Sequence, residues 1–120
     1  MNPLYSDAIE VADRLKEARL NVVRISSDVV QAEYDVTLAQ ARVERGLVKK
    51  VGDEKKLGLT TESRERVFTL ARDADEQYLT QLRRYNEVKI RLEQAKVEVS
   101  ALNDRLNIML TAMKTNEDSS

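Results

Sequence analysis

Apolar residues recur along this chain with an alternating spacing of four and three positions. The first run has no polar member; it comprises Leu4, Ala8, Val11, Leu15, Ala18, Val22, Ile25, Val29, Ala32, Val36, Ala39 and Val43. A 3.5-residue repeat held this long is typical of a coiled-coil seam, whereas an ordinary amphipathic helix drifts relative to a seven-residue spacing. We therefore expect a first helix over about residues 4–49.

A second run follows with the same spacing; it comprises Val67, Ala71, Ala74, Tyr78, Gln81, Tyr85, Val88, Leu92, Ala95, Val99, Leu102, Leu106, Met109 and Met113. Only Gln81 is polar, and a polar residue at such a position often fixes the register or the oligomeric state. Thr60 or Thr61 is a suitable N-cap. We expect a second helix over about residues 61–114, followed by a frayed polar tail over 115–120.

The three glycines of the chain lie between the two runs, at positions 46, 52 and 58. Glycine disfavours a helix interior by about 1 kcal/mol relative to alanine, so this spacing predicts a break. We expect the first helix to end between Gly46 and Lys50, and a turn over about residues 50–60. Such a turn allows residues 1–120 to fold as a single antiparallel helical-hairpin domain.

The register of this hairpin has two solutions. A pairing in which residue numbers sum to 110 sets Val43 against Val67 and centres the turn between Gly52 and Gly58, and it is favoured for that reason. It leaves Met109 and Met113 beyond the start of the first helix. A pairing that sums to 117 instead sets each tyrosine of the second run against an alanine of the first, Tyr78 with Ala39 and Tyr85 with Ala32.

Further apolar residues lie beside the two runs, and a lone hairpin would leave them in water. Exposed apolar patches of this kind usually mark interfaces. The sequence therefore predicts an all-α, antiparallel two-helix coiled coil that assembles into a four-helix homodimer or a higher oligomer. The residues expected at the oligomer interface are Ile9, Val23, Val30, Phe68, Leu82, Met109, Leu110 and Met113.

The composition argues against an enzyme. The 120 residues include no cysteine and no histidine, which excludes disulfides, Cys/His metal sites and histidine acid–base chemistry. Asp73, Asp75 and Glu76 form the one acidic cluster of note. Helical spacing points the two aspartates in different directions, which favours a solvated face over a metal or acid–base site. We expect no enzymatic activity, no cofactor and no metal.

Positive charge collects around the expected turn, although the whole chain carries a net charge of −1. Residues 42–56 contain six basic and three acidic side chains, a local charge of +3. The candidate contacts to nucleic-acid phosphates are Arg42, Arg45, Lys49, Lys50, Lys55 and Lys56. The two interpretations are a phosphate-binding tip without base readout, and a solvated loop with salt bridges to the acidic first helix.

No apolar run approaches the roughly 18 residues that a membrane span requires. The first ten residues contain Asp7 and Glu10 but no basic side chain, unlike a secretory signal. We therefore expect a cytoplasmic protein without a membrane partner.

Two segments resemble small coiled-coil hairpin proteins encoded by phages and prophages in recombination and replication gene clusters. The segments are Gly58-Leu59-Thr60-Thr61-Glu62-Ser63-Arg64 and Asp73-Ala74-Asp75-Glu76-Gln77-Tyr78, ahead of a long Glu/Arg/Ala/Leu helix. The resemblance covers roughly residues 40–110. The family's turn usually reads Gly-x-Asn-x-Glu-x-x-Arg; here Thr60 replaces the asparagine, and the arginine spacing differs.

The resemblance implies a non-enzymatic accessory role with no catalytic residue. It also implies a gene that lies near those of single-strand-annealing proteins, and a protein located in the host cytoplasm. The sequence thus predicts an interaction protein that acts through coiled-coil surfaces, with itself and another protein as partners. Two alternatives stay open: sequence-nonspecific nucleic-acid binding by the basic turn, and inhibition of a host defence protein through the same surfaces.

Overall fold

The computed structural model describes residues 3–118, and these residues form helices without strands. The elements are α1 (Pro3–Val51), the 3-10 helix η1 (Glu54–Leu57), α2 (Thr61–Asp73) and α3 (Glu76–Asp118). The prediction of an all-α chain is confirmed. The chain divides into two compact units: unit 1 comprises Met1–Ser27 with Ile90–Ser120, and unit 2 comprises Asp28–Lys89.

Helix α1 continues past the first glycine and ends at Val51, so the expected end between Gly46 and Lys50 is wrong. The cost of one glycine, about 1 kcal/mol, is too small to stop a long helix. Gly52 ends it instead. Its φ of 87° lies in the left-handed region, and its N–H donates to the Val48 carbonyl at 2.8 Å, a common helix-ending arrangement.

The connection that follows is organised by two N-caps. The Asp53 carboxylate accepts the Lys55 N–H at 3.0 Å and begins η1. The Thr60 hydroxyl accepts the Ser63 N–H at 3.1 Å and begins α2. Each cap satisfies an amide that the first helical turn leaves without a partner. Of the two threonines expected to cap this helix, Thr60 is the one that does.

The second half of the chain is broken, whereas the sequence predicted one helix over residues 61–114. Helix α2 ends at Asp73, and Ala74 donates its N–H back to the Leu70 carbonyl at 3.2 Å. Asp75 then leaves the helical conformation, and its carboxylate accepts the Tyr78 N–H at 2.8 Å. An aspartate stabilises an N-terminus by this bond, so Asp75 favours a new helix over a continuous one.

The last helix extends further than expected. Helix α3 runs to Asp118, so residues 115–118 of the predicted frayed tail are helical. The Thr115 hydroxyl donates to the Thr111 carbonyl at 3.0 Å, which ties the start of this tail to the preceding turn. Residues 119 and 120 of the predicted tail lie outside the described residues.

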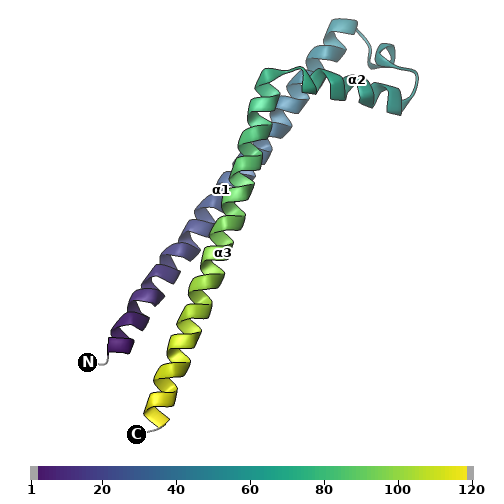
Figure 1. The fold of residues 1–120 in the computed structure, drawn as a ribbon. Coiled ribbons are helices and arrows are strands. Elements are labelled where there is room, and N and C mark those ends of the chain that lie inside the picture. Colours follow the sequence, from purple (N-terminus) through teal and green to yellow (C-terminus); the bar gives the residue numbers. More distant parts are fainter. Residues whose placement is uncertain (1–2, 119–120) are drawn as a thin grey trace. The chain divides into compact units, whose positions relative to one another are not determined.

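In unit 1, the N-terminal part of α1 lies beside the C-terminal part of α3, and the start of α1 and the end of α3 lie at the same end of the unit (Figure 1). The core of this unit consists of Val11, Leu15 and Ala18 of α1 with Leu102 of α3. Val99, Leu106 and Met109 of α3 pack against it.

This packing decides the register within unit 1. Met109 contacts the core cluster and does not extend beyond the start of α1, as a sum of 110 would require. A sum of 117 sets Leu15 against Leu102, and both belong to the cluster. The core of unit 1 therefore agrees with a sum of 117 and not with the favoured sum of 110.

Unit 2 buries its own apolar residues, including Ala32, Ala39, Phe68 and Val88. All twelve members of the first apolar run are buried or half-buried, as a seam requires. Ala74 is exposed, since it lies where the second run is interrupted between α2 and α3. Within residues 3–118, no helix combines the length and the apolarity that a membrane crossing demands.

Candidate functional site

The outer face of α3 in unit 1 carries an apolar stripe away from the seam. Ile90, Val97 and Ile108 are 58%, 67% and 70% exposed, and Ala101 lies between them. Spacings of seven and four residues place all four on one side of the helix. Asp104 lies in the same row. We call these five residues the α3 stripe; they represent apolar surface that the core of unit 1 does not use.

Helix α1 carries a matching row in unit 1. Ile9, Lys16 and Val23 are seven residues apart, and Leu20 falls on the same side. Val23 is 66% exposed, and Ile9 and Leu20 are also exposed. We call these four residues the α1 stripe. Each stripe therefore combines exposed apolar side chains with one charged residue, Lys16 on α1 and Asp104 on α3.

The structure divides the eight predicted interface residues. Ile9, Val23 and Leu110 are exposed in unit 1, and Val30 is exposed in unit 2. Leu82 and Met113 are half-buried.

Two of the eight, Phe68 and Met109, contact the interior of their own units. Phe68 is only 6% exposed, because the interior of unit 2 takes up its ring. Met109 packs against the core of unit 1. Phe68 therefore offers no free surface to a partner, whereas Met109 is half-buried, like Leu82 and Met113. The prediction assumed a continuous second helix paired at 110, which would leave Phe68 beside the seam and Met109 beyond the start of the first helix.

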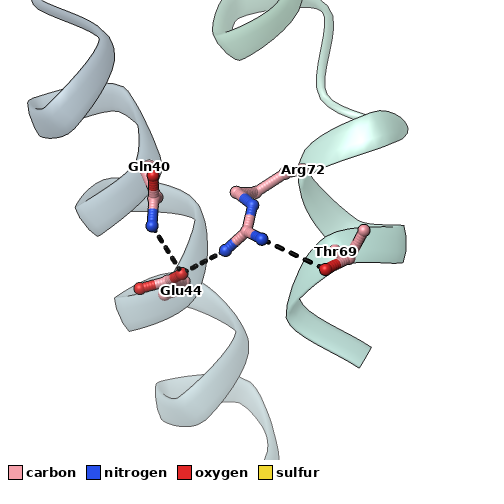
Figure 2. A network of polar contacts seen from close by, with 4 residues as sticks. All are labelled: Gln40, Glu44, Thr69 and Arg72. Atoms are coloured by element: carbon pink, nitrogen blue, oxygen red, sulfur yellow. Dashed lines mark hydrogen bonds and ion pairs between the residues drawn. The ribbon is translucent and has the colours of Figure 1, made fainter. Parts of the chain in front are cut away.

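A polar network joins α1 to α2 in unit 2 (Figure 2). Arg72 donates to the Glu44 carboxylate through Nη1 and to the Thr69 hydroxyl through Nη2, the latter at 3.1 Å. Gln40 donates to the same Glu44 oxygen at 3.2 Å. The Arg72 side chain is 15% exposed, so this ion pair is well shielded from water. The network is a structural contact between helices, and the sequence pattern did not indicate it.

Asp75 has two structural roles. Its Oδ1 accepts from the Tyr78 N–H and from Arg42 Nη2, the second at 2.9 Å. The backbone bond from Tyr78, and then the Arg42 guanidinium, hold the pKa of Asp75 below its usual value.

The other two members of the acidic cluster, Asp73 and Glu76, are exposed. Over the described part of the chain, no three acidic side chains converge as a metal site would require.

The predicted basic contacts all lie in unit 2, in the last turns of α1 and in η1. Arg42 is engaged by Asp75. The other five, Arg45, Lys49, Lys50, Lys55 and Lys56, are exposed. No ion pair is formed by these five within residues 3–118. These five cations lie along the stretch from the end of α1 through η1, which also contains Asp53 and Glu54.

Among the described residues, no polar or charged side chain is buried, so these residues form no enclosed polar site. Comparison of the chain with known families, curated proteins and solved structures finds no match. The exposed apolar stripes and the basic turn are therefore the surfaces through which the described residues can bind a partner.

Proposed function

We propose that this chain is a non-enzymatic interaction protein that acts through the outer faces of its helices and associates with copies of itself. The observation that carries the proposal is the α3 stripe, whose three large apolar residues are 58–70% exposed. These three residues are aligned on one side of a regular helix, whereas apolar residues that are exposed at random would point to different sides. Such a row is the usual form of a helix that binds another helix.

The expected gain is large enough to support association. Complete burial of a valine or isoleucine stabilises by about 1.5–3 kcal/mol, so side chains that are two-thirds exposed offer about 1–2 kcal/mol each. Several such residues on each helix approach the cost of lost translational and rotational freedom, about 4–15 kcal/mol. The gain and the cost are of similar size, so association is expected to depend strongly on concentration.

The test is a measurement of molar mass against concentration by light scattering. One chain has a mass of 13.7 kDa. The proposal predicts masses of at least twice this value at micromolar concentrations, and a fall towards one chain on dilution. A mass that stays at that of one chain up to several hundred micromolar would contradict the proposal.

The setting we propose is accessory work in phage DNA recombination or replication, which is supported by the resemblance of residues 40–110 to phage hairpin proteins. Inhibition of a host defence protein by the same surfaces is the alternative within this class. Affinity capture from the native host, followed by mass spectrometry, separates the two. Recovery of a recombination or replication protein supports the first, and recovery of a defence protein supports the second.

A second candidate function is phosphate-directed nucleic-acid binding. It is supported by the five exposed cations of the turn, which have no ion-pair partner within residues 3–118. Binding of this kind weakens steeply with salt, because it releases counterions from the nucleic acid. A gel-shift titration at low and moderate salt tests it, with the K49E/K50E variant as the comparison. No shift at low salt would exclude this function.

A further inference from the structure

The charges within the two stripes have no partner in the described chain. Lys16 lies among exposed apolar residues of α1, and Asp104 lies among those of α3. Neither forms an ion pair within residues 3–118. A charged residue in an apolar stripe costs stability when the stripe is covered, unless an opposite charge meets it. The two stripes carry opposite charges, one each.

We propose that the α3 stripe of one copy packs antiparallel against the α1 stripe of a second copy, which deepens the proposed self-association by naming its surfaces. A register in which paired residue numbers sum to 120 sets Val97 against Val23 of the second copy. The same register sets Asp104 against Lys16 and Ala101 beside Leu20 of that copy. Val97 and Ala101 thus meet apolar members of the α1 stripe, and the two charges meet at the same level.

The residues that flank the stripes agree with this register. When two helices pack antiparallel, the residues on the same side of each stripe, viewed from the N-terminus of each helix, lie next to each other. Asp13 of one copy then lies within one helical turn of Arg105 of the other, since their numbers sum to 118. Arg24 and Glu98, which sum to 122, are related in the same way. These four side chains are exposed and form no ion pair in the described residues. Exposed pairs add little affinity but select partner and orientation.

Pairing of either stripe with its own copy brings like charges together. An antiparallel pair of α1 stripes centred on Lys16 sets Lys16 against itself. An antiparallel pair of α3 stripes that matches Ile90 with Ile108 brings Arg91 opposite Arg105. Like charges across an interface oppose association and so direct each stripe to the other one.

The contact is therefore heterologous: one copy offers α3 and the next copy offers α1. Each copy keeps one stripe free after a single contact. Heterologous contacts continue into closed rings or open filaments, whereas a two-fold contact stops at a dimer. Self-association by this route is expected to proceed beyond two copies.

The test uses one blocked stripe per variant. V23D blocks the α1 stripe and V97D blocks the α3 stripe; both positions are exposed, so the helices are retained, which circular dichroism checks. Light scattering should show each variant alone as a single chain at concentrations where the unmodified protein assembles. An equimolar mixture should form a 1:1 pair and stop there, because V97D supplies the intact α1 stripe and V23D the intact α3 stripe. If either variant alone still assembles, or if the mixture stays as single chains, the proposal is wrong.

Exchange of the two stripe charges, at Lys16 and Asp104, gives an independent test of the pairing. K16E and D104K should each weaken assembly at least tenfold, and the K16E/D104K double variant should restore it. L110D is the matched control, because Leu110 is exposed on α3 but lies about 140° around the helix from Val97. If the unmodified protein assembles and all these variants assemble equally well, this pairing fails while self-association stands. If the unmodified protein never assembles, the proposed function itself fails.

Discussion

Arg42 and Asp75 are joined by an ion pair, with 2.9 Å between Nη2 and Oδ1, that links α1 to the first turn of α3 within unit 2. The same carboxylate oxygen caps α3 by accepting the Tyr78 N–H. One aspartate thus begins a helix and fixes it against another. Both contacts stabilise the ionised form of Asp75, which is why they lower its pKa.

The first prediction concerns the pH dependence of stability. A lowered pKa in the folded state means that the contribution of Asp75 is complete above the unfolded value of about 3.9 and is lost as the pH falls through the folded value. D75N removes this titration but keeps a capping side chain, since asparagine caps helices well. The difference in melting temperature between the unmodified protein and D75N should be constant above about pH 5 and shrink below pH 4. A difference that does not change with pH down to pH 2 would contradict this role.

The second prediction concerns Phe68. Its burial means that F68A leaves a cavity, which should reduce the free energy of unfolding by about 3–5 kcal/mol in a denaturant titration. L70A is the matched control on the same helix, because Leu70 is 70% exposed, and its truncation should change stability by less than about 0.5 kcal/mol. Equal effects of the two truncations would show that Phe68 is not an internal residue of unit 2.

The third prediction contrasts two glycines. A Cβ at Gly58 would lie 2.6 Å from the Ser63 Cβ and 3.1 Å from the Arg64 backbone nitrogen, so G58A should destabilise by about 1–3 kcal/mol. A Cβ at Gly46 meets nothing within 4 Å, and this residue lies inside α1. G46A should therefore stabilise by about 0.5–1 kcal/mol. Thermal unfolding of both variants checks the pair, and a stabilising G58A would contradict the close approach at the start of α2.

The fourth prediction concerns the register of unit 1. The chain has no cysteine, so introduced pairs report proximity without background. L15C/L102C, which matches the sum of 117, should oxidise readily to an intramolecular disulfide. L15C/A95C, which matches 110, should not, because the two positions are about one heptad, roughly 10 Å, out of step along the helices. Preferential oxidation of the second pair would restore the register of 110.

The sequence was sufficient for the helical class and for the seam, because a four-three repeat requires only that one side of a helix be buried. Leu4 to Val43 shows this, since every member of the run is at least half-buried. The break before α3 was missed because the apolar repeat passes through Ala74 without a change of phase. Its local signal was Asp75, an N-cap residue followed by acidic Glu76 in the first turn of α3.

The register and the surfaces were harder to predict for a different reason. The sums of 110 and 117 differ by one heptad, so both place apolar residues opposite each other, and only the packing of Met109 separates them. The predicted interface set included Phe68 because an apolar residue beside a seam can face inward or outward. The distinction depends on how α2 lies within unit 2, which the repeat does not encode.

The central claim is that the chain acts by helix association through the α1 and α3 stripes. Its most direct test is oxidation of an equimolar mixture of the V23C and V97C variants, with one of them labelled with nitrogen-15. Mass spectrometry then distinguishes mixed from identical pairs. The account predicts that mixed V23C–V97C disulfides clearly outnumber both identical pairs and exceed those formed by an L110C control. A predominance of identical pairs, or no cross-linking above that control, would contradict it.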